Sequence, residues 1–335
     1  MRRSRSVLAT VGLAAATALT LTACAGGGDA PAETGGDGSA GGESFSIGIS
    51  QLAQHPALDA AAEGFQAAFD EAGIDADFDL QNANGEQATA TTIAQTFQTS
   101  GKDLILAIAT PAAQAAAQAI ADAPVLFTAV TDPQEAGLVE SNDAPGGNVT
   151  GTTDLNPVAD QLALLKEIMP DAQSVGIIYS SGEVNSQVQV DLAKEAADEL
   201  GITISEATVT NASEVATAAQ TLGDVDAIYV PTDNRVTEAF ETVVQYAEDN
   251  QVPLFGSEVD QVARGAIATL GLDYYELGYQ TGEMAIRILT EDADPASMPV
   301  ETLSEFLLNV NPGAAERMGI TVPEDVLGRA DETIE

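Results

Sequence analysis

The sequence contains one cysteine, one histidine and no tryptophan among its 335 residues. A single cysteine excludes an intramolecular disulfide framework and multi-cysteine zinc or iron–sulfur sites, and a single histidine excludes the common two-histidine metal centres. Basic residues are also few, with 11 Lys and Arg against 52 Asp and Glu and a formal net charge of −41. Such a chain would repel a phosphate backbone, so we expect no nucleic-acid partner, and we expect neither a metal nor another cofactor.

The sequence also lacks the motifs that present the common catalytic centres. No Gly-x-Ser-x-Gly motif could expose a serine nucleophile to His55, and neither a Walker loop nor a Gly-x-Gly-x-x-Gly motif follows a predicted strand. Pairs of acidic residues are expected by chance among 52 carboxylates. We therefore expect a protein without enzymatic activity, and a secreted α/β enzyme that uses His55 or carboxylates is the alternative.

The first 23 residues have the pattern of a secretion signal. Arg2, Arg3 and Arg5 precede an apolar stretch at residues 7–21, which is short for a membrane span. The Leu-Thr-Ala-Cys at residues 21–24 resembles the bacterial lipobox, in which the cysteine is diacylated. We expect a signal peptide at residues 1–23, a lipid on Cys24 that holds the protein on the extracytoplasmic face of the cell membrane, and a flexible tether at residues 24–44. Ordinary cleavage that leaves a free cysteine is the alternative.

The rest of the chain alternates short runs of β-branched residues with Ala-rich segments of helical length. This alternation is typical of parallel sheets covered by helices on both faces. The predicted strands are 45–50, 76–80, 103–109, 124–130, 174–180, 202–209, 227–230, 253–256 and 266–270. The predicted helices are 57–72, 86–100, 111–122, 157–169, 185–200, 213–222, 235–250 and 275–291.

The two halves of this body resemble each other. Residues 103–111 have a counterpart in 226–233, and residues 124–127 have one in 253–255. The order of the segments is the same in both halves, which indicates a repeated architecture. We therefore predict an α/β fold of two similar lobes, each with a doubly wound parallel sheet, and a boundary near residues 151–156.

Polar residues stand at the carboxyl ends of the predicted strands, the edge at which open parallel sheets bind ligands. Free N–H groups at helix starts, with the hydroxyls of Thr110 or Ser186, can hold a carboxylate, whereas Asp132, Glu183 or Asp233 can hold an ammonium group. A zwitterionic amino acid fits both demands. Each residue also has a purely structural interpretation, as a helix N-cap or as part of a turn. The residues at these edges include Gln51, His55, Thr110, Asp132, Glu183, Asn185, Ser186, Asp233, Asn234 and the pair Ser257–Glu258.

Several of these segments together resemble the tryptophan/tyrosine-type substrate-binding lipoproteins of bacterial ABC importers. In the first half the matching segments are 48–51, 55–59, 103–105, 107–114, 130–133, 136–139 and 145–151. In the second half they are 182–183, 185–186, 229–234, 271 and 273–275. Because several motifs occur in order between about residue 45 and residue 292, the resemblance is far more specific than any one of them.

The resemblance implies a type I periplasmic-binding-protein fold, in which two lobes joined by three crossovers close over a ligand. It places residues 45–153 and 265–300 in the N-terminal lobe and residues 154–264 and 301–335 in the C-terminal lobe. The implied ligand-binding residues are Gln51, His55, Thr110, Asp132, Glu183, Asn185, Ser186, Asp233 and Asn234. The aromatic residues expected near the cleft are Phe127, Tyr179, Tyr274 and Tyr275.

The function implied by the resemblance is that of an extracytoplasmic receptor for a small solute. We expect an amino acid, aromatic amino acids included, that is captured between the lobes and delivered unaltered to a membrane permease driven by a separate ATPase. We expect the receptor to be a monomer. A sugar, nucleoside or peptide-like ligand in the same cleft is the alternative within this class.

Overall fold

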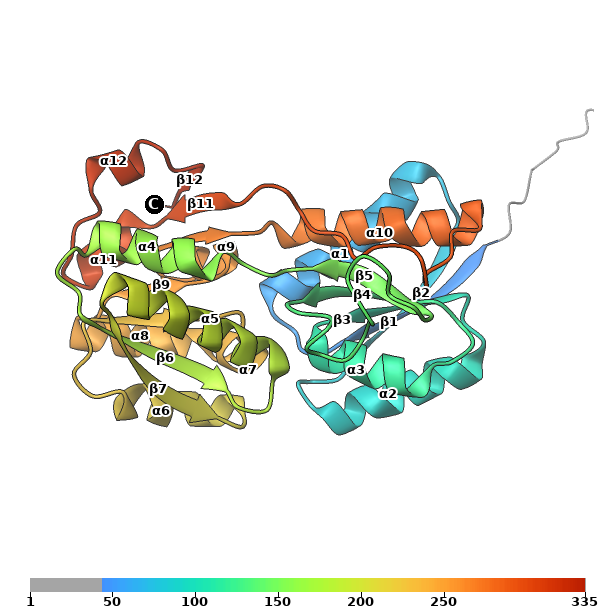
Figure 1. Cartoon of the computed structure of the whole chain (residues 1–335), viewed down its shortest axis with the longest axis horizontal. Coiled ribbons are helices and arrows are strands. Elements are labelled where there is room, and N and C mark those ends of the chain that lie inside the picture. Colours follow the sequence, from blue (N-terminus) through green and yellow to red (C-terminus); the bar gives the residue numbers. More distant parts are fainter. Residues whose placement is uncertain (1–43, 335) are drawn as a thin grey trace, which may run out of the picture. The chain divides into compact units, whose positions relative to one another are not determined.

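The computed structural model of the chain describes residues 44–334 (Figure 1). Within this range each of two lobes has its own parallel sheet and its own hydrophobic core. The predicted signal peptide, the predicted lipid on Cys24 and the predicted tether up to residue 43 lie outside the described residues. No helix in the described range is long and apolar enough to span a bilayer.

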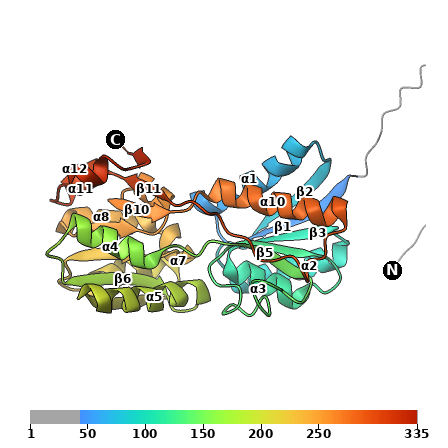
Figure 2. The ribbon, with the colours of Figure 1, turned by 45° about the horizontal axis from the view of Figure 1, so that its top comes forward.

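The first lobe is built on a five-stranded parallel sheet with the strand order β2-β1-β3-β4-β5. Its strands are β1 (Phe45–Gln51), β2 (Ala76–Asn82), β3 (Leu104–Ile108), β4 (Val125–Val130) and β5 (Val149–Thr153). Strands β3 and β4 are buried along their whole length, as their unbroken apolar sequences predict. Helices α1 (Pro56–Ala72) and α10 (Tyr274–Glu291) cover one face, and α2 (Gln87–Ser100) and α3 (Thr110–Ala119) cover the other (Figure 1 and Figure 2).

Helix α10 comes from late in the sequence and packs directly on α1. A Cβ atom on Gly64 would lie 2.0 Å from the carbonyl oxygen of Tyr275, and a Cβ atom on Gly278 would lie 2.0 Å from the carbonyl oxygen of Ala61. The two glycines therefore allow the helix backbones to touch, which any larger residue would prevent. This contact fixes the start of α10, and with it Tyr274, to the first lobe.

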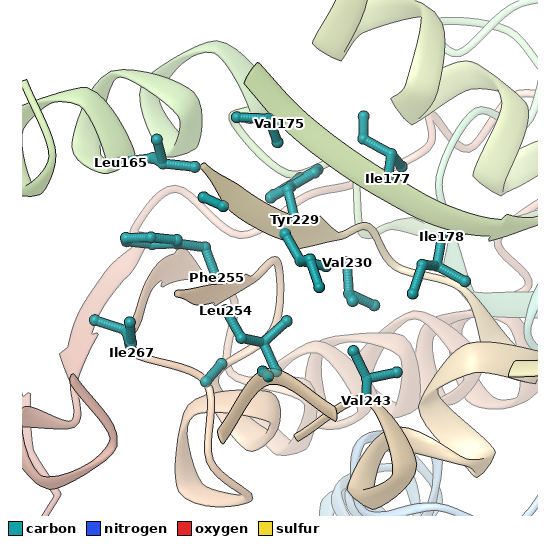
Figure 3. Packing of buried hydrophobic residues seen from close by; sticks show 14 of the residues in the cluster. Leu165, Val175, Ile177, Ile178, Tyr229, Val230, Val243, Leu254, Phe255 and Ile267 are labelled. Atoms are coloured by element: carbon teal, nitrogen blue, oxygen red, sulfur yellow. The ribbon is translucent and has the colours of Figure 1, made fainter. Parts of the chain in front are cut away.

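The second lobe has a four-stranded parallel sheet with the order β7-β6-β8-β9. Its strands are β6 (Ser174–Ser180), β7 (Thr203–Val209), β8 (Ala227–Val230) and β9 (Leu254–Gly256). The helices of this lobe are α4 (Val158–Ile168), α5 (Val184–Leu200), α6 (Val215–Thr221), α7 (Asn234–Glu238), α8 (Phe240–Asn250) and α9 (Val259–Ala263), with a 3-10 turn at Ala212–Glu214. Figure 3 shows Val175, Tyr229 and Phe255 from three neighbouring strands within one continuous core.

A small third sheet belongs to the second lobe. It consists of β10 (Ala268–Gly271), which runs antiparallel to β11 (Leu307–Val310), and β12 (Glu332–Thr333), and two short helices, α11 (Pro312–Arg317) and α12 (Glu324–Leu327), follow β11. Ala266, Ile267 and Ala268 lie in the core of the second lobe, although they belong to the range 265–300 that was assigned to the first lobe. The reason is that β10 pairs with β11 before the chain crosses. Leu303, assigned to the second lobe, packs against the first core, and the exact domain bounds stay a prediction.

Three chain segments cross between the lobes, at residues 154–157, 272–273 and 304–306. The predicted α/β fold with two similar parallel-sheet lobes is confirmed, and most predicted elements are present within a few residues. Several elements differ: the short elements α9, α11, α12 and β12 were not predicted, and two further differences have a clear cause. The helix predicted at residues 235–250 is divided into α7 and α8 because Ala239 leaves the helical conformation at φ −110° and ψ 24°. Strand β5 was not predicted, since Val-Thr-Gly-Thr-Thr contains a single strongly apolar residue.

Candidate ligand-binding site

An enclosed cavity lies at the carboxyl ends of the strands, where residues of both lobes and of the crossing segments meet. Its lining residues are His55, Ala57, Leu58, Ala129, Thr131, Asp154, Asn185, Thr232, Asn234, Glu258 and Tyr274. Three of them, His55, Asn185 and Asn234, are among the predicted ligand-binding residues. The edge of the sheets that the sequence indicated therefore does contain a chamber of mixed polar and apolar character.

His55 ends the loop after β1 and is the N-cap residue of α1, which begins at Pro56. Its Nε2 atom lies 3.4 Å from Oδ1 of Asn234 in the second lobe. Burial lowers the pKa of His55 to about 4, although the contact with Asn234 opposes this shift. The imidazole is therefore neutral at neutral pH.

Glu183 is the centre of a buried polar cluster in the second lobe. Its Oε2 atom accepts hydrogen bonds from Nδ2 of Asn234 at 2.5 Å and from Nδ2 of Asn185 at 3.2 Å. Burial, and next the charge of Asp233, raises the pKa of Glu183 to about 7. Its Oε1 atom is buried and has no hydrogen-bond partner in the described part of the chain. Glu183 therefore orients both asparagine side chains that line the cavity.

Asp233 and Ser186 are engaged with the protein itself. Asp233 accepts hydrogen bonds from the backbone N–H groups of Val236 at 2.8 Å and Ser180 at 2.5 Å, and from the hydroxyl of Ser186 at 2.6 Å. The first of these bonds makes Asp233 the N-cap of α7. Burial raises the pKa of Asp233, and the hydrogen bonds from Ser186 and Ser180 oppose that shift. Both residues support the helix that presents Asn234 to the cavity.

The remaining predicted residues, Gln51, Thr110 and Asp132, lie at the same edge of the first lobe, outside the residues that line the enclosed cavity. Gln51 donates to Oδ1 of Asp59 at 2.6 Å and to the carbonyl oxygen of Ala53 at 2.8 Å. Asp132 is partly exposed and its Oδ1 accepts from two backbone N–H groups of the turn that follows it. Thr110 is the first residue of α3, after the N-cap Ala109, and its buried hydroxyl has no partner among the residues that the structure describes.

Five polar residues outside the nine implied ligand-binding residues also line the cavity: Thr131, Asp154, Thr232, Glu258 and Tyr274. Asp154, in the first crossing segment, accepts hydrogen bonds from the hydroxyls of Tyr274 at 2.8 Å and Thr131 at 3.0 Å. Burial raises the pKa of Asp154. Burial also raises the pKa of Tyr274 well above its usual range. Two signals were available in the sequence, because Glu258 follows a strand of the second lobe and Tyr274 was among the expected aromatic residues. Asp154 carried no such signal, because it lies on a crossover.

The electrostatics of the cavity favour a cationic group. Of the lining residues named above, none is Lys or Arg, whereas Asp154 and Glu258 are carboxylic acids. Burial raises the pKa of Glu258 well above its usual range, and the charges of Asp260 and Asp154 add to this effect. A positively charged ligand group would stabilise the ionised form of such a carboxyl. Apolar surface comes from Ala57, Leu58 and Ala129.

Contacts between the lobes surround the cavity. Nε2 of Gln189 in α5 lies 3.4 Å from the hydroxyl of Thr131, and Nη1 of Arg235 in α7 lies 3.9 Å from Oε1 of Glu86. These two contacts, together with the contact between His55 and Asn234, join the second lobe to the loops that follow β1, β2 and β4 in the first lobe. Two lobes with separate cores, three crossing segments and an enclosed polar cavity define a two-lobed solute-binding protein that can close around a small molecule.

The family model for ABC transporter substrate binding proteins matches residues 46–334, so the chain belongs to this family. A tyrosine-binding protein from Clostridioides difficile (strain R20291) is 44% identical over 270 residues, which cover 79% of this chain and 78% of that protein. The chain is thus the substrate-binding component of an ABC transporter. More distant solved structures, among them a glucose-galactose binding protein from Geobacillus stearothermophilus with 19% identity and a TM-score of 0.56, share the type I periplasmic-binding-protein fold.

Two solved structures of related proteins differ in the presence of a ligand. A protein from Streptococcus pneumonia in complex with L-Trp is 37% identical with a TM-score of 0.84, and the match covers 87% of this chain and 100% of that one. A ligand-free, open substrate binding protein from Clostridium difficile is 40% identical with a TM-score of 0.66, over 87% of this chain and 99% of that one. Sequence identity is similar in both comparisons, so the difference in TM-score indicates that the lobes of this chain are arranged more like those of the complex.

Proposed function

We propose that the protein binds an aromatic amino acid, tyrosine or tryptophan, in the cavity between its lobes and delivers it unaltered to the permease of its transporter. The observation that carries this proposal is the enclosed cavity, which combines buried carboxyls, neutral polar groups and an apolar wall. A free amino acid offers a cationic, an anionic and an apolar part to such a site.

The relatives support an aromatic side chain on the ligand. A tyrosine-binding protein is 44% identical to this chain, and a protein solved with L-Trp has a TM-score of 0.84. The neighbours with sugar ligands are under 20% identical and support the fold alone. Within the cavity, Tyr274 supplies an aromatic ring, whereas the other expected aromatic residues do not line it: Phe127 and Tyr179 are buried in the cores and Tyr275 is partly exposed on α10.

We further propose that the protein acts outside the cytoplasm as a monomer held at the membrane by a lipid on Cys24, and that it has no catalytic activity. The lipobox-like Leu-Thr-Ala-Cys at residues 21–24 supports the anchor. Replacement of Cys24 by Ser should release the protein from the membrane fraction into the medium, as fractionation and immunoblotting would show. A Cys24→Ser protein that stays with the membrane would contradict the lipid anchor.

A thermal-unfolding screen tests the ligand class directly. The purified protein would be heated with single amino acids, sugars and nucleosides, and Tm would be recorded for each mixture. A ligand at 100 times its Kd stabilises the folded state by about 2.7 kcal/mol, which is a readily measured increase in Tm. We expect L-tyrosine or L-tryptophan to raise Tm. An increase with a sugar and none with any amino acid would overturn the proposal.

A further inference from the structure

Glu258 differs in its hydrogen bonding from the buried carboxyls of Asp154 and Asp233. Oε1 of Glu183 also lacks a partner in the described chain, but Glu183 does not line the cavity, whereas Glu258 does. Asp154 accepts from two hydroxyls, and Asp233 accepts from two backbone N–H groups and one hydroxyl. The Oε2 atom of Glu258 is buried, and no hydrogen-bond donor reaches it from residues 44–334. The residue is 1% exposed and lines the cavity. A buried carboxyl oxygen in this situation is costly unless a ligand supplies the missing donor.

Two other lining residues present free acceptor atoms. Asn185 uses its Nδ2 group to donate to Glu183 and to the carbonyl oxygen of Thr232, and its Oδ1 atom is buried without a donor in the described chain. His55 presents Nδ1, which likewise has no partner within the described range. All three residues that carry these acceptors line the same small cavity.

The tautomer of His55 follows from the hydrogen bonds of its neighbours. Asn234 donates from Nδ2 to Oε2 of Glu183, so its Oδ1 atom is an acceptor. Nε2 of His55, 3.4 Å from that oxygen, must therefore carry the hydrogen. The other ring nitrogen, Nδ1, is then an acceptor in the neutral imidazole. Glu183 thus sets, through Asn234, which atom of His55 is available to a ligand.

We propose that Oε2 of Glu258, Oδ1 of Asn185 and Nδ1 of His55 accept the hydrogen bonds of a primary ammonium group on the ligand, and that Glu258 supplies the compensating charge. A primary ammonium has three N–H donors, which matches three free acceptors. Since His55 belongs to the first lobe and the other two residues to the second, the ammonium would bridge the lobes and favour the closed state. The inference rests on the proposed function. It adds that the site recognises the ligand's ammonium group and that Glu258 determines the preference for ligands that carry this group.

The decisive experiment compares two ligands on two proteins, the wild type and one variant. Calorimetric titrations would measure Kd for L-tyrosine and for 3-(4-hydroxyphenyl)propanoate, which lacks only the ammonium group, with wild-type protein and with Glu258→Gln. The wild type should prefer L-tyrosine, and Glu258→Gln should reduce that preference by about 10- to 100-fold, since it removes the charge from a charge-assisted hydrogen bond. Loss of affinity for both ligands by the same factor would show a merely structural role and overturn the proposal.

A matched control and a folding check complete the design. Glu195, exposed on α5, gives the control variant Glu195→Gln, which should keep the wild-type preference. Tm of Glu258→Gln should not fall below that of the wild type, because the amide is a close match in shape and carries no buried charge. An unchanged preference in Glu258→Gln would refute the ammonium site while the proposed function stood. Failure of the wild type to bind any amino acid would refute the proposed function itself.

Discussion

Nε2 of His55 lies 3.4 Å from Oδ1 of Asn234, and this contact joins the two lobes at the wall of the cavity. Both side chains are buried, with 5% and 7% of their surface exposed. Asn234 also donates a hydrogen bond to Glu183. The contact with His55 therefore connects the first lobe to the polar cluster around Glu183 in the second lobe. We therefore expect these side chains to couple ligand binding to closure of the lobes.

Replacement of His55 by Ala should weaken ligand binding without unfolding the protein. The variant loses the hydrogen bond to Asn234 in the closed form and the Nδ1 acceptor of the proposed ammonium site, so we expect Kd to rise by at least about 10-fold, more than one neutral hydrogen bond is worth. Calorimetric titration with L-tyrosine measures this change. Gln54, the exposed preceding residue, gives the control Gln54→Ala, which should bind as the wild type does. Equal Kd values for both variants would show that His55 does not contribute.

The raised pKa of Glu183 predicts a pH dependence of stability. The folded state holds the proton up to about pH 7, whereas the unfolded chain releases it near the ordinary value of 4.5. The folded state therefore binds more protons in this window, and the free energy of unfolding falls as pH rises from about 4.5 to 7. The decrease should be on the order of 2–3 kcal/mol for the protein without ligand.

Denaturant titrations of the wild type and of Glu183→Gln, from pH 4.5 to 8, would isolate this effect. His55 acts with the opposite sign, because its lowered folded pKa of about 4 makes stability rise with pH up to its ordinary value of 6.5. That contribution is present in both proteins and cancels in the difference. We expect Glu183→Gln to gain stability relative to the wild type as pH rises. A difference that is constant with pH would contradict the assignment.

Asp233 should matter more for stability than for direct contact with the ligand. Asp233→Ala removes the N-cap of α7 and leaves two backbone N–H groups and the hydroxyl of Ser186 without their acceptor. Each unsatisfied buried donor costs about 1–3 kcal/mol, so we expect a marked decrease in Tm in the absence of ligand. Asp198→Ala, at an exposed position of α5, is the control. A Tm equal to that of the control would exclude the supporting role.

Gly85 tests whether the closed arrangement of the lobes is the one that binds the ligand. A Cβ atom at this position would lie 2.3 Å from Nη1 of Arg235 in the other lobe, and the φ angle of Gly85 is +73°. Gly101, with φ +68°, has nothing within 4 Å of its Cβ position. Alanine at either site strains the backbone similarly, but only Gly85→Ala also displaces the guanidinium of Arg235 from this contact between the lobes. Only this variant should therefore bind L-tyrosine more weakly, and by a modest factor, because the Arg235 side chain can move.

Removal of the obstructing side chain should restore binding. In the double variant Gly85→Ala with Arg235→Ala, Kd should return toward the wild-type value, because the space taken by the guanidinium becomes free. Titration of the four proteins under one set of conditions gives the comparison. Equal weakening in Gly85→Ala and Gly101→Ala would mean that backbone strain, rather than lobe contact, explains the effect.

The sequence predicts the lobes and the edge of the site better than the individual contacts. Strands such as β3 and β4 are recognisable because their residues are apolar and buried throughout, and parallel sheets place Glu183, Asn185 and Asn234 at one edge. Hydrogen-bond partners are not visible in a sequence, so nothing distinguished Asp233, which caps a helix, from a free carboxylate. Asp154 reaches the cavity only because a crossover passes there, which depends on tertiary structure.

The most direct test of the account is a crystal structure of the protein grown with L-tyrosine or L-tryptophan. We predict one amino acid in the cavity between the lobes, with its ammonium group within hydrogen-bond distance of Glu258, Asn185 and His55 and with the lobes closed. An amino acid bound elsewhere on the protein, or a cavity that stays empty at saturating ligand, would contradict amino-acid binding between the lobes.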